Sequence, residues 1–246
     1  MTKPYIILSL VTSIDTSSWN FGCRFLSALL LFDGKLTPEF VSNVEPIKTP
    51  FVSVDETEEF WAPTVVVRGP HGRTEAKSSF LWRRLRSVKH DGHVMHTSIN
   101  KMGKKALGSI IVRAQVNREI EWLSVFRDLC MVVQPKFGML HLFTEQELVE
   151  AGFKSPEYLF QSGPPGWAVE GSIPNLAWAS FLGDELAAEV GRERLVGHGF
   201  SVDSMANGHL ITVTESLLDV AERFDEFSKR RAELKGLFRP GLFQIN

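Results

Sequence analysis

The order in which strand-like and helix-like segments follow one another constrains the fold of this chain more than any other feature of its sequence. Runs of β-branched and aromatic residues at 5–11, 64–68, 108–116 and 137–143 are typical of strands. Between them, apolar residues recur every three or four positions, as on one face of a helix. The two kinds of segment do not alternate as in repeated βαβ units. We therefore predict an α+β fold, with long amphipathic helices packed on a mixed, largely antiparallel sheet that contains hairpins.

Capping residues indicate where the helices begin. A Ser, Thr, Asn or Asp before an apolar helical pattern can accept a hydrogen bond from a free backbone N–H of the first turn. By this criterion, helices begin at Asn20, Asp55, Asn117, Thr144, Ser155, Asp184 and Ser216. The helix that follows Ser216 has the clearest pattern, and we expect it to reach Gly236 as a single element.

Two dipeptides predict tight hairpin turns. Asp91-Gly92 would join the run at 80–88 to the run at 94–99, and Asn207-Gly208 would join 200–206 to 209–214. Both dipeptides suit a type I′ turn, whose two central residues need a positive φ. The sequence therefore predicts two hairpins with these residues at their tips.

The 246 residues predict a single domain, 1–246, with a subdivision near 145–175 as the alternative. The subdivision would follow from the segment 161–175, which contains three Pro, three Gly and Trp167. Apolar residues on both sides of this segment favour a loop that packs on one body.

The sequence also bears on the cellular compartment. Cys23 and Cys130 both lie in apolar helical patterns, which predicts two buried thiols and a reducing compartment. The apolar run at 5–11 is short and lacks a small-residue cleavage site, so we read it as a strand. No stretch approaches the length of a membrane span. We expect a cytoplasmic protein that does not use a membrane as its partner.

Two groups of residues are candidates for enzymatic chemistry. His90, His93 and His96 lie close together, but no cluster of carboxylates or thiols completes a ligand set, so we predict a solvated hairpin tip. Glu75 and Lys77, preceded by an acidic residue such as Asp55, resemble the metal-and-lysine core of restriction-type nucleases.

In this sequence, however, the Glu75–Lys77 pair follows a turn-like segment rather than a strand end. We expect a protein that is not an enzyme and that has no metal and no cofactor. A metal-dependent nuclease remains the alternative.

Charge is distributed unevenly along a chain whose net charge is only −2. Residues 68–136 carry 14 Lys or Arg against 5 Asp or Glu, and residues 141–226 carry 15 Asp or Glu against 4 Lys or Arg. Either the two halves attract one another within the fold, or the acidic half offers a negative surface to a basic partner. The candidate partner-binding acids on the predicted helices are Asp184, Glu185, Glu189, Glu193, Asp219, Glu222, Asp225 and Glu226.

The basic half raises the alternative of a nucleic-acid surface. Arg83, Arg84 and Arg86 follow Phe80 and Trp82, and interleaved basic and aromatic residues often hold single strands. The same pattern is typical of a half-buried strand with Arg side chains along its edge. Because the sequence pI of 6.4 is low for such a binder, we expect no direct nucleic-acid binding.

One part of the sequence resembles a known family. The segment 174–183 (PNLAWASFLG), the following Asp184-Glu-Leu and the stretch 191–195 (GRERL) precede a hairpin and a terminal amphipathic helix. Residues and element order over about 165–238 are similar to the immunity protein 52 family and its relatives among type VI secretion immunity proteins. The first strand and the helix after it share a looser likeness, and residues 35–115 do not match.

The resemblance implies a cytoplasmic immunity protein that binds and neutralises a cognate secreted toxin, and so protects the producing cell and its sister cells. In that family the toxin is typically a restriction-endonuclease-like DNase, and no catalytic residues are carried over. Trp178, Phe181, Gly183 and Gly191 fit structural roles in the core and at helix boundaries. The other function that the resemblance leaves open is an adaptor, which would bind an effector of a secretion system without blocking it.

Overall fold

The computed structural model describes residues 3–69, 72–99, 105–150 and 175–244, together with Gly103 and Ile173. The helix start predicted at Ser155, the segment around Trp167 and Pro174 of the family resemblance lie outside these residues. Among the helices that are described, none combines the length and the apolar character needed to cross a membrane.

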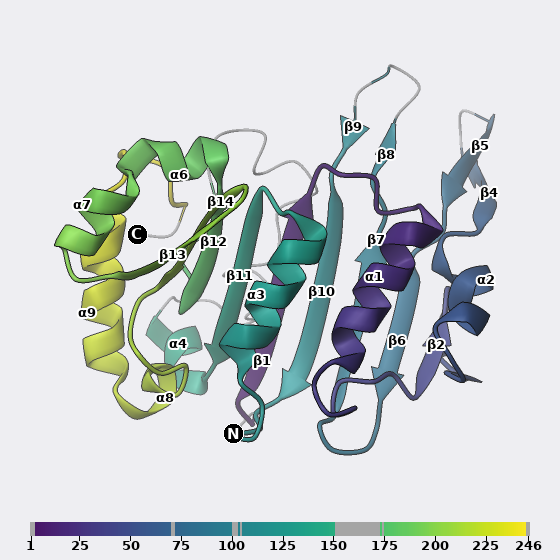
Figure 1. The fold of residues 1–246 in the computed structure, drawn as a ribbon, viewed down its shortest axis with the longest axis horizontal. Helices are drawn as coiled ribbons and strands as arrows, with labels where there is room; N and C mark the ends of the chain where they lie inside the picture. The colour runs from purple at the N-terminus through teal and green to yellow at the C-terminus, as the bar shows by residue number, and fades with distance from the viewer. Residues whose placement is uncertain are drawn as a thin grey trace.

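The fold is α+β, as predicted, and is built on one ten-stranded sheet in which every described strand pair is antiparallel (Figure 1). Its strands come from both sides of residues 145–175. In spatial order they are β13 (Ser201–Met205), β14 (Gly208–Thr212), β12 (Ala179–Gly183), β11 (Phe137–Phe143), β1 (Tyr5–Thr12), β10 (Gly108–Gln115), β7 (His90–Met95), β6 (Phe80–Arg84), β2 (Phe40–Ser42) and β3 (Thr49–Pro50).

Two further hairpins form separate two-stranded sheets, and the helices lie around the large sheet. The hairpins are β4 (Thr64–Gly69) with β5 (Gly72–Lys77), and β8 (Ser98–Ile99) with β9 (Lys105–Ala106). The helices are α1 (Trp19–Leu30), α2 (Glu58–Trp61) after a 3₁₀ turn (Asp55–Thr57), α3 (Trp122–Val133), α4 (Glu145–Glu150), α6 (Asp184–Val190), α7 (Arg192–Gly197), α8 (Asp219–Glu222) and α9 (Phe224–Lys235).

Helices α1 and α3 lie side by side across one face of the sheet (Figure 1). The apolar stripe of α3 is buried, as its spacing predicted, and Phe126 and Leu129 are fully inaccessible to solvent. Gly138 on β11 lets this helix approach closely, because a Cβ there would lie 2.8 Å from Leu10 and 3.2 Å from the Phe126 ring. Side-chain packing of α3 on β1 and β11 therefore forms the centre of the core.

The hairpin predicted at Asp91-Gly92 is wrong. Both residues lie inside β7, and the chain turns earlier, between β6 and β7 at 85–89. Gly92 is opposite Trp82, whose buried ring fills the space over it. A Cβ at Gly92 would overlap that ring and lie 2.6 Å from the Ile111 carbonyl oxygen. The glycine makes room for an aromatic side chain and does not form a turn.

The second predicted hairpin exists, but its turn is shifted by one residue. Ala206 and Asn207 form the turn, and Gly208 is the first residue of β14, paired with Met205. A Cβ at Gly208 would collide with the Leu182 carbonyl oxygen of the neighbouring strand. Close approach of β12 and β14, rather than the φ of a type I′ turn, explains this glycine.

Several helix boundaries differ from those predicted. Helix α1 is capped by Ser18, whose Oγ accepts from the Phe21 N–H at 3.4 Å, and not by Asn20. Helix α3 begins at Trp122, because the residues after Asn117 form a separate turn. The long last helix is two helices, since Arg223 between α8 and α9 has a non-helical φ of −140° and ψ of 50°.

The predicted cap at Thr144 is confirmed, but Ser216 is not the N-cap of α8, which is Leu218 and makes no side-chain capping hydrogen bond. The Glu147 N–H donates to the Thr144 Oγ1 at 3.2 Å, at the start of α4. The Ser216 N–H donates to the Asp219 carboxylate at 3.1 Å, ahead of α8. Each bond satisfies a backbone donor that the helix itself leaves free.

Gly92→Ala should lower the free energy of unfolding by about 1–3 kcal/mol, because the added methyl group must displace the buried Trp82 ring. Urea unfolding followed by tryptophan fluorescence measures the change. Gly197→Ala is the control, since a Cβ there meets no atom within 4 Å and that residue lies at the end of α7. Equal unfolding midpoints for the two variants would contradict the packing described for Gly92.

Candidate functional site

The eight candidate acids fall into two groups on the part of the fold that contains β12, β13 and β14. Asp184, Glu185, Glu189 and Glu193 lie on α6 and α7, and Asp219, Glu222, Asp225 and Glu226 lie on α8 and α9. Figure 1 places α6 and α7 near one end of these strands and α8 near the other. The acids therefore form two surface groups rather than one patch.

Three of these acids are engaged by basic residues of the same chain. Glu185 lies 3.5 Å from the Lys136 Nζ, and Glu222 lies 2.7 Å from an Arg118 Nη. Glu189 accepts two hydrogen bonds at 3.0 Å from the Arg239 Nε. Lys136 and Arg118 belong to the basic half of the sequence, so these contacts join the two halves. Attraction within the fold thus accounts for part of the charge asymmetry.

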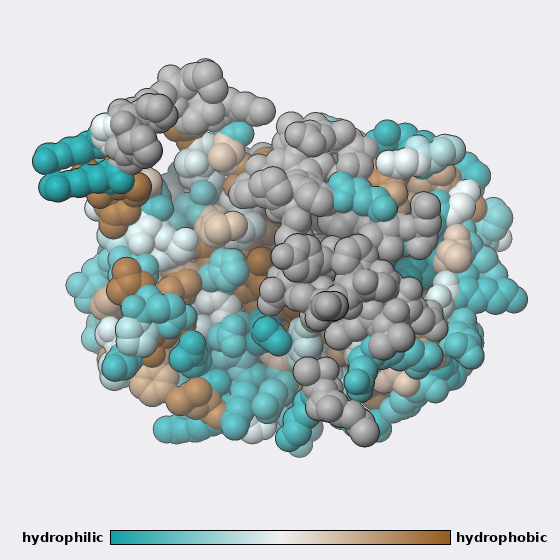
Figure 2. Space-filling model, turned by 180° about the vertical axis from the view of Figure 1, so that it is seen from behind, coloured by the Kyte–Doolittle hydropathy of each residue, from teal (hydrophilic) through white to brown (hydrophobic). Residues whose placement is uncertain are grey.

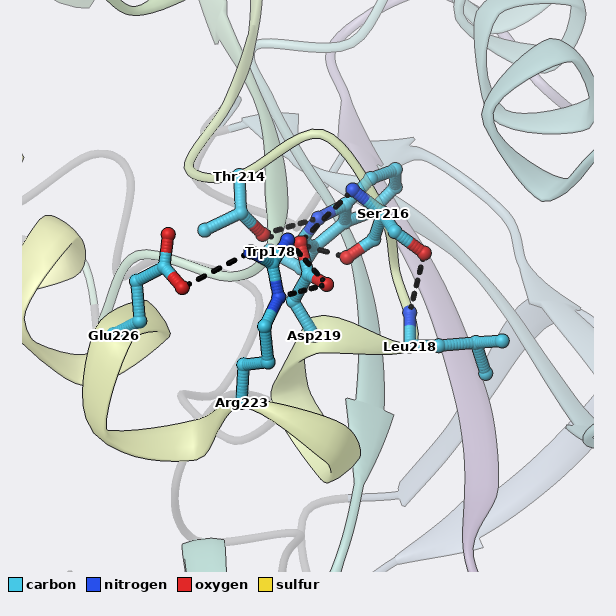
Figure 3. A network of polar contacts seen from close by, with 7 residues as sticks. All are labelled: Trp178, Thr214, Ser216, Leu218, Asp219, Arg223 and Glu226. Atoms are coloured by element: carbon cyan, nitrogen blue, oxygen red, sulfur yellow. Dashed lines mark hydrogen bonds and ion pairs between the residues drawn. The ribbon is translucent and has the colours of Figure 1, made fainter.

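Two further candidates stabilise the junction of α8 and α9 (Figure 3). Asp219 is buried, and its Oδ1 accepts from the Arg223 Nε at 3.0 Å and from an Arg223 Nη at 2.9 Å. The other Arg223 Nη donates to Glu226 at 3.0 Å. Hydrogen bonding and charge from Asp219 raise the pKa of Arg223. The arginine thereby holds two helices together at the point where the backbone breaks.

The remaining three candidates are exposed and unengaged. Asp184, Glu193 and Asp225 form no hydrogen bond or ion pair within the described part of the chain. Their carboxylates are therefore the members of the predicted set that a basic partner can reach without breaking a contact of the fold.

A buried charged cluster links β11, α4 and α9, and the sequence did not predict it. An Arg231 Nη donates to the Glu147 Oε1 at 2.5 Å, and the His141 Nε2 lies 3.6 Å from the same oxygen. The side chains of His141 and Glu147 are essentially inaccessible, at 0% and 1% exposure. The Trp178 N–H donates to the His141 Nδ1 at 3.0 Å, so the neutral ring carries its proton on Nε2, toward Glu147.

The environment sets the ionisation of this cluster. Burial lowers the pKa of His141 and outweighs the opposite effect of Glu147. Burial alone would raise the pKa of Glu147, but hydrogen bonds from His141 and Arg231 and the positive charge of Arg231 lower it to about 2. A buried carboxylate paired with an arginine is closed off from solvent, which makes the cluster a link between elements.

The nuclease-like residues are placed differently from the sequence prediction. Glu75 and Lys77 lie on strand β5, which already begins at Gly72 within the segment that was predicted to be turn-like, and both are exposed. The Lys77 Nζ donates to the Thr64 Oγ1 at 3.1 Å. Within the described ranges, no group of three or more His, Cys, Asp or Glu residues is positioned to hold a metal ion.

The three clustered histidines do not form a solvated tip, so that prediction is wrong. His90 and His96 are buried, and burial lowers the pKa of both and of the half-buried His93. The His90 Nδ1 lies 2.8 Å from the Val88 carbonyl oxygen. The His96 Nε2 lies 2.7 Å from the Trp61 carbonyl oxygen. These imidazoles are engaged by the backbone of the core.

The two cysteines are both free thiols. Cys130 is buried as predicted, and burial raises its pKa well above the ordinary value. Cys23 is only half-buried, so the prediction of two buried thiols holds for one of them.

The basic strand β6 is a half-buried strand, which was one of the two interpretations of its sequence. Phe80 and Trp82 are fully buried, so their rings cannot stack on bases. Its arginines are engaged by the body of the protein: an Arg84 Nη donates to the Thr37 carbonyl oxygen at 2.9 Å, and Arg83 lies 3.7 Å from Glu45.

Comparison with known proteins gives one informative relationship. No family model and no curated protein matches this chain, so the resemblance to the immunity protein 52 family gains no support. Among solved structures, a Pseudomonas aeruginosa T6SS protein, PA0821, is similar with a TM-score of 0.59 and 13% sequence identity. The likeness covers 85% of this chain and 68% of that one. The likeness shows that the two chains share a fold.

The buried Glu147 predicts a pH dependence of stability. Its folded pKa of about 2 lies below the ordinary value of 4.5, so its stabilisation is complete above about pH 4.5 and is lost as the pH falls toward 2. The parent protein should lose on the order of 3 kcal/mol more unfolding free energy across this window than Glu147→Gln. Urea titrations at a series of pH values measure it, and parallel curves for the two proteins would refute the assignment.

Proposed function

We propose that this chain is an immunity protein of a type VI secretion system, which binds and neutralises a cognate secreted toxin in the cytoplasm of the producing cell. The observation that carries the proposal is the fold shared with a T6SS protein over 85% of the chain. The sequence resemblance to immunity proteins over residues 165–238 points in the same direction. A nuclease is the toxin class that this resemblance favours.

The three unengaged acids supply a contact with such a toxin. A nuclease presents a basic groove to its substrate, and carboxylates that cover or flank the groove complement it electrostatically. Asp184, Glu193 and Asp225 can meet basic side chains without breaking an ion pair among the residues that the structure describes. Opposite charges on the two partners would speed their association, and most of the affinity would lie in slow dissociation.

Co-expression with the toxin tests the function. The toxin domain encoded beside this gene is induced with and without this chain, and surviving cells are counted. Survival together with a co-purifying complex is expected. Cell death in the presence of abundant folded protein would refute immunity to that toxin. A stable complex with a toxin that stays active would favour the adaptor.

Charge reversal tests the surface. The triple variant Asp184→Lys, Glu193→Lys and Asp225→Lys should slow association with the toxin by at least about tenfold at low salt. The control reverses three exposed carboxylates elsewhere, Asp55, Glu58 and Glu59, with the same change in net charge. Surface plasmon resonance measures the association rate. Equal rates for both variants would exclude the α6–α9 acids from the interface.

A further inference from the structure

Two β-hairpins project from one edge of the molecule without joining the large sheet (Figure 1). The first arm is β4 with β5, and the second arm is β8 with β9. All described residues of the first arm whose burial is resolved, 64–68 and 72–77, are exposed. A two-stranded hairpin on its own is marginally stable in water, so the first arm adds surface to the protein rather than core.

The first arm combines exposed apolar residues with a basic tip. Val65, Val66 and Val67 are 38%, 58% and 52% exposed, which is unusual for three consecutive valines. At the tip, Arg68 lies directly opposite Arg73 in the strand register. Like charges in this arrangement repel, and a carboxylate placed between them would relieve the repulsion.

The second arm repeats this chemistry. Ile99 is 72% exposed, and it pairs across the strands with Lys105, so the two side chains share one face. A cleft of about 530 Å³ separates the arms, and Thr64, Glu75, Ala76 and Lys77 line it on the side of the first arm. Figure 2 shows the molecule from behind, where hydrophilic and hydrophobic residues are mixed over the surface that is not drawn in grey.

We infer that the two arms form a docking surface for an acidic segment of a protein partner. The described part of the arms carries Arg68, Arg73, Lys77 and Lys105 against a single acid, Glu75. Asp15 also lines the cleft, but its carboxylate already accepts two hydrogen bonds from Ser17, at 2.9 and 2.7 Å. The surface is therefore complementary to carboxylates, with valine and isoleucine beside the positive charges.

The apolar residues favour a protein over a nucleic acid. Exposed valines and isoleucine gain free energy by burial against apolar side chains, whereas a strand of nucleic acid is held by stacking on aromatic rings. Neither arm contains Phe, Trp or Tyr in its sequence. The nearby rings of Phe80 and Trp82 are fully buried.

This surface is distinct from the acidic groups on α6–α9, and it selects a partner of opposite charge. The inference of this docking surface does not require the partner to be a toxin. A failed protection assay would therefore not contradict it. Both surfaces can also engage a single partner that carries a basic region and an acidic region.

Defined probes test the inference. Fluorescence anisotropy is measured with a labelled peptide of alternating valine and glutamate, a valine–lysine peptide, single-stranded DNA and vesicles rich in phosphatidylserine. The valine–glutamate peptide should bind saturably and the other probes should not. Arg68→Glu with Arg73→Glu should weaken its binding by at least about tenfold. Val65→Ser with Val67→Ser should also weaken it, through lost apolar contact.

The matched control is Lys48→Glu with Lys89→Glu, which changes the net charge equally at exposed sites away from the arms. It should bind the peptide like the parent protein. Because the substituted arm residues are exposed, thermal melts of all variants should coincide. Equal loss in the arm and control variants, preferential binding of DNA or vesicles, or no binding of the acidic peptide would overturn the inference.

Discussion

The packing of strand β1 between β10 and β11 is the constraint on which the rest of the structure depends. Leu8 is opposite Val112 on one neighbour and Leu140 on the other, so residues more than a hundred positions apart meet across three strands. Helix α3 covers the same strand, and Gly138 lets the Phe126 ring approach it. The helices, the charged clusters and the two arms are all arranged around these three central strands.

Many charged side chains of this protein form contacts within the fold. Contacts such as Arg118–Glu222 and Lys136–Glu185 join the basic and acidic halves, and Glu147 is buried against Arg231. Exposed pairs of this kind contribute little stability each, whereas removal of one partner from the buried pair leaves an uncompensated charge. A surface acid is thus a good candidate for partner binding only after its contacts within the fold are known.

The structure separates two surfaces of opposite character. Three carboxylates on α6–α9 that contact no other described residue through a hydrogen bond or ion pair suit a basic partner, and the two arms combine positive charge with exposed valine and isoleucine.

The sequence by itself determined the elements whose pattern records local burial. Strands β10 and β11 and the apolar face of α3 follow from spacing alone, because the periodicity of a strand or helix shows which face is buried. The cap at Thr144 likewise follows from the local sequence. Only the tertiary structure decided that Gly92 makes room for Trp82, that five of eight candidate acids are engaged, and that His141 meets Glu147 and Arg231. These outcomes depend on side chains that are far apart in the sequence, and no local pattern records which distant residue will lie opposite.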